Sequence, residues 1–182
     1  MNRFKNHYKY VVQYDLINKL SHVNCITVPK IKSISLNFGI KETVISTKKI
    51  LPPLLALELL TGQKGVVTKS KKDLIKYKIR KGMIVGCKVN LSNKNNIFSF
   101  LEKLISMTLP RIRYFNGIRK GQVTQRGNLN FRINDLLAFH ELEQEYEKFK
   151  DLPPLDINIV TTSKTQKEAI LLLSNFQIPF IK

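Results

Sequence analysis

The stretch KIKSISLNFG, residues 30–39, alternates apolar and polar side chains with a period of two. Ile34, Leu36 and Phe38 fall on one side of an extended chain, and serines and an asparagine fall on the other. Successive side chains of a strand point to opposite faces, so this alternation predicts a β-strand with one face on a core and one face open.

The same alternation returns three times further along the chain. The segments are MIVGCKVNL (83–91), NLNFRI (128–133) and DINIV (156–160). Each of the four strands carries an asparagine on its polar side: Asn37, Asn90, Asn130 and Asn158. One-sided alternation is typical of antiparallel sheets. The predicted fold class is α+β: an antiparallel sheet with helices packed on one face, and a polar sheet face and long basic loops open to a ligand.

Between these strands the apolar residues follow helical spacing. Helices are expected over residues 2–20, 43–61 and 96–107, and Thr165 with Glu168 forms a capping box for a final helix. In residues 2–20 the spaced residues are Phe4, Tyr8, Val11, Val12, Leu16 and Leu20. Pro52 and Pro53 are expected to kink or split the second helix, and Gly62 to end it. A short strand is expected at 65–68, an irregular segment at 108–127, and the last strand at 156–160.

The composition points to an anionic partner. The chain has 182 residues, enough for a single domain with a substantial core, and a formal net charge of +18. AT-rich codons would favour lysine over arginine, but they do not explain why only 13 acids are present. Nucleic acid is therefore the first expectation. A membrane surface ranks far behind it, because neither a long apolar stretch nor a clean basic amphipathic helix is found.

Two segments concentrate the positive charge. The first runs from Lys64 to Lys94 and contains one acid, Asp73; its centre, Lys69 to Gly82, is longer than an ordinary hairpin loop. We interpret this centre as an arm that orders on a phosphate backbone, the alternative being a mobile, solvated loop. In the second, residues 109–132, arginine outnumbers lysine and Tyr114 and Phe115 lie between the arginines. These aromatic rings either stack on unpaired bases or belong to the core.

Catalytic and metal-binding patterns are not found. His7, His22 and His140 are scattered, and no HExxH, GxSxG, Walker A or GxGxxG spacing occurs. Cys25 and Cys87 form no CxxC pair and are expected to be free buried thiols rather than zinc ligands. No enzyme activity, cofactor or metal is expected.

The order of the motifs resembles the universal large-subunit ribosomal protein five, the family that holds 5S ribosomal RNA. The similarity covers nearly the whole chain. It rests on the segments VPKIKSISLNFGIKE, LLTGQKGVVTKSKK, YKIRKGMIVGCKVNL, FLEKLISMTLPRIRYFNGI, RGNLNFRI and DINIVTTSKTQKEAILLLSNFQIPF. The resemblance implies a structural role in the central protuberance of the large subunit. The implied partners are 5S rRNA or its replacement, large-subunit rRNA, the peptidyl-site tRNA and a protein of the small-subunit head.

The resemblance also implies which residues contact RNA. Positions matching the family's segments, together with polar-face positions of the strands, give the expected rRNA-binding residues: Asn37, Gly39, Gln63, Lys64, Thr68, Lys69, Lys88, Asn90, Arg111, Arg113 and Arg132. The basic loop implied to reach the tRNA carries Lys71, Lys72, Lys76, Lys78, Arg80 and Lys81. The chain departs from the family at Gly65, usually proline, at Lys81, usually an acid, and at Arg132, usually a small residue. The segment from Leu137 to Leu155 also diverges, and its acidic part, 141–151, has no assigned partner.

Codon-linked composition and the lack of a typical presequence indicate a protein made inside an organelle. The opening HYKYVVQYDLINKL is more similar to mitochondrial members of the family than to plastid or bacterial ones, which remain the alternatives. The competing function of another class is a nucleic-acid-binding regulator outside the ribosome. An RNA-modifying enzyme would need a cofactor pocket for which the sequence gives no motif.

Overall fold

The computed structural model describes residues 3–20, 27–40 and 47–181. The chain divides into two compact units. Unit 1 comprises residues 1–34, 91–131 and 158–182, and unit 2 comprises residues 35–90 and 132–157. The expectation of a single domain stays a prediction, and each unit is described by itself.

The strands confirm the α+β fold class. A five-stranded sheet has the order β2-β3-β1-β6-β5, and a second, two-stranded sheet pairs β4 with β7. The strands are β1 (Ile31–Gly39), β2 (Val66–Lys69), β3 (Ile84–Leu91), β4 (Ile118–Arg119), β5 (Leu129–Ile133), β6 (Leu155–Thr161) and β7 (Phe180–Ile181). The β2–β3 pair is antiparallel and carries an irregularity at Thr68 and Lys69. The strand predicted as the last, β6, is followed by β7, so that expectation was wrong.

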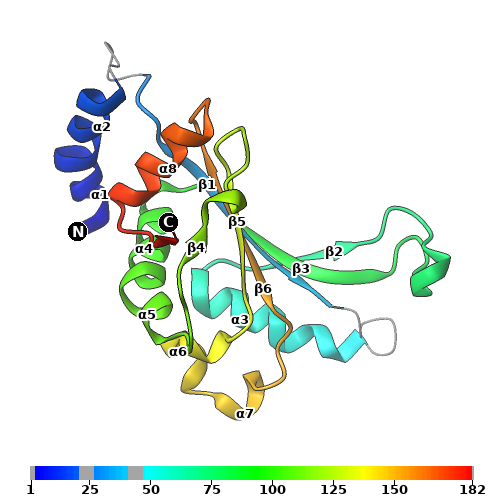
Figure 1. Ribbon diagram of the computed structural model, residues 1–182. Coiled ribbons are helices and arrows are strands. Elements are labelled where there is room, and N and C mark those ends of the chain that lie inside the picture. Colours follow the sequence, from blue (N-terminus) through cyan, green and yellow to red (C-terminus); the bar gives the residue numbers. More distant parts are fainter. Residues whose placement is uncertain (1–2, 21–26, 41–46, 182) are drawn as a thin grey trace. The chain divides into compact units, whose positions relative to one another are not determined.

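Helices and helical turns fill the connections (Figure 1). The α-helices are α1 (Arg3–His7), α2 (Gln13–Leu20), α3 (Leu51–Thr61), α4 (Lys94–Lys103), α5 (Leu109–Arg111), α6 (His140–Glu143), α7 (Tyr146–Phe149) and α8 (Gln166–Asn175). Two π-helical stretches, η1 (Tyr8–Val12) and η5 (Leu104–Thr108), make the helices on either side of them continuous. Single 3-10 turns lie at η3 (Thr47–Ile50), η4 (Ile75–Tyr77), η6 (Lys120–Gln122) and η7 (Leu136–Ala138).

The alternating strands are buried on the side that the sequence predicted. Ile34, Leu36 and Phe38 of β1 are fully buried, as are Ile157 and Ile159 of β6 within one per cent. The polar positions Lys88, Asn90, Asn130, Arg132 and Asn158 are exposed, whereas Asn37 is half-buried. Burying one such aliphatic or phenyl side chain stabilises the fold by about 1.5–3 kcal/mol. The period-two pattern therefore predicted the buried side chains, except that Met83, just before β3, and Val85, near its start, are only half-buried.

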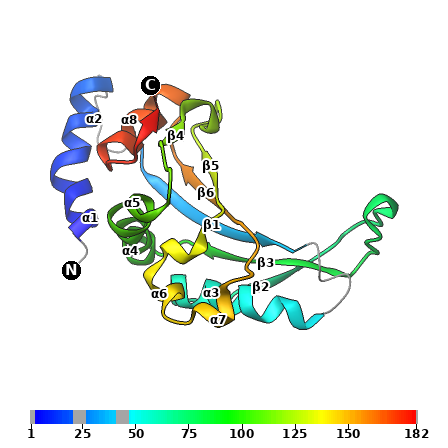
Figure 2. The same ribbon diagram turned by 60° about the horizontal axis from the view of Figure 1, so that its bottom comes forward.

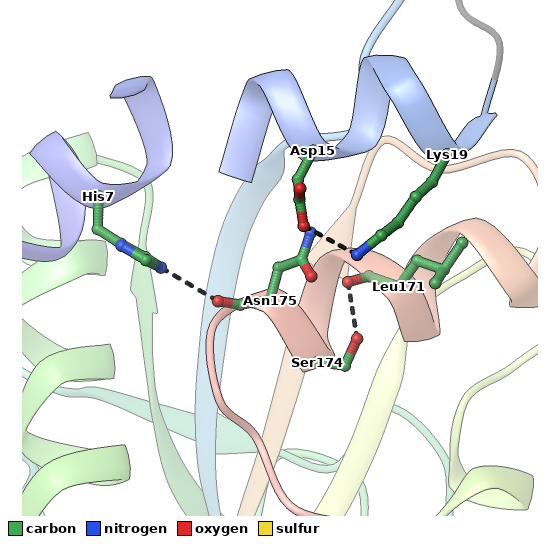
Figure 3. Close-up of polar contacts among 6 residues, drawn as sticks. All are labelled: His7, Asp15, Lys19, Leu171, Ser174 and Asn175. Carbon is green, nitrogen blue, oxygen red and sulfur yellow. Dashed lines mark hydrogen bonds and ion pairs between the residues drawn. The ribbon is translucent and has the colours of Figure 1, made fainter. Parts of the chain in front are cut away.

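Unit 1 packs its N-terminal helices against α4 and α8 (Figure 1). An aromatic cluster joins them: the ring of Phe176 stacks on Phe4 and on Tyr8, with centroids 6.1 and 5.9 Å apart. Figure 3 shows polar contacts of the same elements: His7 Nε2 donates to the Asn175 carbonyl at 3.2 Å, and Lys19 pairs with Asp15 at 2.8 Å. Val11 is 51 % exposed, against the prediction, because the π-helical stretch shifts the buried face after Tyr8.

Unit 2 places α3 against α6 and α7 (Figure 2). Pro52 and Pro53 lie in the first turn of α3, where the missing amide hydrogens cost nothing. The predicted helix changes type just before them, from the 3-10 turn η3 to α3, and α3 is continuous beyond them. The first part of the helix predicted there, residues 43–46, lies outside the described residues. The helix ends as predicted at Gly62, whose left-handed conformation (φ 66°) lets its amide donate to the Glu58 carbonyl.

The structure also tests the predicted cap of the final helix and the segment 108–127. Thr165 caps α8 by accepting from the Glu168 amide, and the Glu168 carboxylate accepts from the amide of Lys164 rather than from that of Thr165. Residues 108–127, predicted to be irregular, contain α5, β4 and η6. β4 forms only because β7 returns beside it as a parallel partner.

Candidate nucleic-acid interface

The polar side of β1 and β3 brings several expected RNA-binding residues together in unit 2. The Ile40 amide donates to the Val85 carbonyl at 2.9 Å, and Ser35 Oγ donates to Asn90 Oδ1 at 3.1 Å. This antiparallel register places Asn37 opposite Lys88. A cation and two amides therefore lie on neighbouring strands, where they can reach phosphate and sugar oxygens.

The lack of a side chain at Gly86 allows β3 to approach β1 closely. A Cβ atom on Gly86 would lie 2.1 Å from the Phe38 carbonyl oxygen and 3.3 Å from Thr68 Oγ1. Gly39, the expected contact residue at the end of β1, has nothing within 4 Å of the same position and is exposed. Gly86 is thus a packing requirement, whereas Gly39 leaves open backbone that a ligand can approach.

Arg132, on β5, has an acidic partner that the sequence analysis missed. Its guanidinium donates from Nε to Oδ1 of Asp156 at 2.6 Å and from Nη2 to Oδ2 at 3.2 Å. This hydrogen bond, and then the carboxylate charge, raise the pKa of Arg132 above its ordinary value. Asp156 was predicted to lie on the polar side of its strand, so the pairing of β5 with β6 was the missing information. Two of the arginine's donor directions are occupied within the chain, while its side chain is 61 % exposed.

The basic arm, residues 69–82, has a folded conformation of its own. Ser70 and Met83 pair at its base, and Leu74 and Ile79 form an isolated bridge near its tip. The two limbs run out together from β2 and β3 (Figure 1). These hydrogen bonds give the arm its shape. That it orders on a phosphate backbone stays a prediction.

Asp73, the single acid of the arm, supports that shape. Its Oδ1 accepts the backbone amide of Lys81 at 2.6 Å. The charged side chains of the arm are exposed: Lys69, Lys71, Lys72, Lys78, Arg80 and Lys81. Lys76 lies in η4, between Ile75 and Tyr77, which are 92 % and 63 % exposed. The arm is therefore a cationic ribbon with an apolar tip.

Two further expected contacts follow α3. Thr61 Oγ1 donates to the Leu57 carbonyl at 2.7 Å and accepts the Gln63 amide at 3.2 Å, which fixes the chain as it leaves the helix. Gln63 is half-buried and Lys64 is exposed. Gly65 stands against Leu54, whose Cδ1 would be 2.8 Å from an added Cβ. The backbone path thus presents Lys64 to solvent while keeping Gln63 close to the helix.

In unit 1, Arg111 ends α5 and Arg113 follows it; both are exposed. The two aromatic residues after them differ: Tyr114 is 96 % exposed, and Phe115 is half-buried. The sequence left both rings between base stacking and core. The structure excludes the core for Tyr114.

Other kinds of site receive no support from the described residues. Within 3–20, 27–40 and 47–181, no helix is long and apolar enough to cross a bilayer. The same residues contain no group of three or more His, Cys, Asp or Glu side chains placed to hold a metal ion. Cys87 is a free buried thiol, as expected, and burial raises its pKa to about 12. Cys25 lies outside the described residues.

Comparison with known families decides between a ribosomal protein and a nucleic-acid-binding regulator outside the ribosome. The family model described as ribosomal protein L5 matches residues 24–80, and the model for the C-terminus of the same ribosomal family matches residues 84–180. The chain belongs to the ribosomal protein L5 family. The two matches meet where the basic arm returns to β3, so each covers one of the strands that carry it.

A relative extends this family assignment over the whole chain. Large ribosomal subunit protein uL5m of Reclinomonas americana is 50 % identical over 182 residues, which cover 100 % of both chains. The L5 family consists of structural, non-enzymatic ribosomal components, and the chain is accordingly a structural ribosomal constituent rather than an enzyme. The relative is mitochondrial, which supports the mitochondrial ribosome over the plastid and bacterial alternatives.

Proposed function

We propose that this L5 family member is built into the large ribosomal subunit by contacts with 5S rRNA and the adjoining large-subunit rRNA. The observation that carries the proposal is the placement of the half-buried Asn37 opposite the exposed Lys88, beside the exposed Asn90, on the polar side of the strands. Neutral amides there suit sugar and base edges, and the lysine suits a phosphate. Gly39 continues this surface without a side chain, so RNA backbone can approach closely.

The remaining expected contacts extend the interface in each unit. In unit 2, Gln63, Lys64, Thr68 and Lys69 lie along the chain that leads into the arm, and Arg132 offers the donors that Asp156 leaves unused. In unit 1, Arg111 and Arg113 are exposed at the end of α5. Arginine forks match phosphate oxygens, which supports rRNA as the partner of this segment.

The basic arm has a separate task in this proposal. Its folded, cationic ribbon reaches the peptidyl-site tRNA and contacts the tRNA phosphates. The exposure of Lys71, Lys72 and Lys78 supports this role, as does the use of Asp73 inside the arm, where its charge is directed at the backbone. A contact with a protein of the small-subunit head completes the proposed set of partners.

Crosslinking of the tagged protein in its native cells, followed by sequencing of the attached RNA, tests the proposal. We expect reads on 5S rRNA and on the adjoining large-subunit rRNA, with tRNA crosslinks confined to residues 69–82. Reads on large-subunit rRNA without any 5S rRNA would mean that the strand surface binds a replacement. Scattered messenger RNA, together with failure to sediment with the large subunit at moderate salt, would contradict the proposal and favour a free regulator.

A further inference from the structure

Tyr114 has a strained backbone conformation, and its ring is hardly packed against the rest of the protein. Its φ is 58°, in the left-handed region, where the Cβ atom of a non-glycine residue crowds the following carbonyl oxygen. Its side chain is 96 % exposed, so the ring buries almost nothing in return. A bulky residue in this region is an outlier. Its backbone strain and its exposure together indicate a ring displayed for a ligand.

The structure fixes both ends of the loop that displays this ring. On one side Leu109 is buried in α5, and the Phe115 amide donates to the Ile112 carbonyl, which closes a turn around Tyr114. On the other side the Ile118 amide donates to the Pro179 carbonyl at 2.8 Å, at the start of the β4–β7 pair. Tyr114 therefore projects from a loop anchored at both ends, which lowers the entropic cost of ordering it on a ligand.

The chain passes very close to β7 at Gly117, next to the second of these hydrogen bonds. A Cβ atom on Gly117, which has φ 111°, would lie 3.1 Å from the Pro179 carbonyl oxygen. The chain between Tyr114 and β4 thus packs closely against the residues at the start of β7. The ring has little freedom to fold back by moving this part of the loop.

The charge around the ring identifies the class of ligand. Arg111, Arg113, Arg119 and Lys120 are exposed in the same segment, and the sequence has no acid between Glu102 and Asp135. A polyanion with flat, unstacked rings fits an exposed tyrosine among arginines. Single-stranded or looped RNA has that chemistry, because unpaired bases stack on aromatic side chains while phosphates bind the neighbouring cations.

We propose that Tyr114 is a base-stacking residue, whose ring packs on an unpaired base of ribosomal RNA while Arg111 and Arg113 contact the flanking phosphates. The inference rests on the proposed rRNA-binding function. It adds that the loop carrying Tyr114 binds an unpaired nucleotide of that RNA. Phe115, half-buried beside it, anchors the loop instead of binding the base.

The absence of tryptophan from the sequence gives a direct reporter. In Y114W the single indole should be quenched when the full-length protein binds 5S rRNA, or a fragment of the large-subunit rRNA that adjoins it. The matched control is Y146W, at a tyrosine that is 55 % exposed on α7, and its fluorescence should not change. An RNA duplex of equal length without unpaired nucleotides should leave Y114W unquenched.

Affinity measurements on three variants complete the test. Removal of a stacked aromatic ring costs about 1–3 kcal/mol per base, so Y114A and Y114N should bind the responding transcript roughly 5- to 150-fold more weakly, whereas Y114F should bind like the wild type. Asparagine tolerates left-handed backbone better than tyrosine, so Y114N should also melt at a higher temperature. Loss of affinity with a gain of stability is an outcome that a structural role cannot give.

Three results would overturn the inference in different ways. If the wild type binds the transcripts but Y114A and Y114N bind equally well, the stacking role fails while the proposed rRNA-binding function stands. If the wild type binds neither transcript, both fail. Quenching of Y114W by a small-subunit protein fraction, with none by RNA, would assign the ring to a protein partner and overturn the stacking role.

Discussion

Arg132 and Asp156 form a two-point ion pair across the neighbouring strands β5 and β6, with Nε to Oδ1 at 2.6 Å and Nη2 to Oδ2 at 3.2 Å. Both side chains lie on the polar side of their strands, and Arg132 is exposed. The pair keeps the guanidinium in one orientation and cancels its charge locally. It therefore controls how much of this strand surface attracts phosphate.

Neutralising Asp156 should strengthen RNA binding. D156N keeps the shape of the side chain but removes the charge, so Arg132 becomes available to a phosphate and the plot of log affinity against log salt should steepen by about 0.7–0.9. R132A leaves Asp156 facing the RNA and should weaken binding. The double variant R132A/D156N separates the two effects in a titration of 5S rRNA over several salt concentrations. Weaker binding by D156N would instead show that the pair acts as a rigid positioning unit.

The arm lysines should matter for tRNA rather than for 5S rRNA. Changing Lys71, Lys72 and Lys78 together to alanine removes three exposed charges from the ribbon and should abolish tRNA crosslinks. Each lost phosphate contact should also reduce the salt slope for tRNA by about one. Affinity for isolated 5S rRNA should stay unchanged, and translation in the organelle should fall.

The control for this triple variant removes equal charge elsewhere. Lys5, Lys9 and Lys19 are exposed on the N-terminal helices and can be changed together to alanine. This control should keep its tRNA crosslinks. An arm variant that lost 5S affinity as severely as N37A would contradict the division of labour between the arm and the strand surface.

Asp73 offers a test in which charge and fold act in opposite directions. D73A makes the arm more basic, yet it removes the acceptor of the Lys81 amide, which lies 2.6 Å from Oδ1. If the shape of the arm governs the tRNA contact, D73A should weaken it despite the added positive charge, and hydrogen exchange at the Lys81 amide should accelerate. D73N, which retains an oxygen acceptor, should be close to the wild type. Stronger tRNA binding by D73A would mean that charge alone decides.

Two glycines on neighbouring strands should respond differently to alanine. G86A forces a Cβ to within 2.1 Å of the Phe38 carbonyl oxygen, a backbone atom that cannot move without displacing β1. We expect a loss of about 3 kcal/mol or more in the free energy of unfolding, at the upper end of overpacking effects. G39A meets nothing within 4 Å, so its stability should change by no more than about 0.5 kcal/mol while its 5S affinity falls. Denaturant titration and RNA binding of both variants check this contrast.

Cys87 predicts how stability depends on alkaline pH. Burial raises the pKa of its thiol from 9.0 to about 12, so the folded protein holds this proton while the unfolded chain releases it. Unfolding therefore gains a driving force as the pH rises from about 9 to 12, and the contribution of the neutral thiol is fully present only below pH 9. Tyr8, whose pKa burial raises to about 12, acts in the same direction.

The measurement is the urea midpoint at pH 8 and at pH 10, for wild type and C87A. We expect C87A to be less stable at pH 8 but to lose less stability between the two values. In a C25S background the remaining thiol should react slowly with iodoacetamide until the protein unfolds. Rapid alkylation of the folded protein would show that Cys87 is accessible.

Local patterns in the sequence determined the four alternating strands, most of their buried faces, and the ends of two helices. Ile34, Leu36 and Phe38 are buried because a pleated chain sends alternate side chains to one face, and this depends only on neighbours in sequence. Gly62 and Thr165 marked helix ends because capping also depends only on residues that are near in sequence. The family assignment, and with it the structural ribosomal role, also came from linear motifs.

Only the tertiary structure decided which residues meet across strands and which aromatic rings face solvent. The sequence placed Asp156 and Arg132 on polar positions, but their ion pair depends on the register of β5 with β6. Likewise β4 exists because β7 returns beside it, and the sequence left Tyr114 between core and solvent until the structure showed its ring exposed. Contacts between residues far apart in the chain are set by how whole elements pack, a property that no short segment carries by itself.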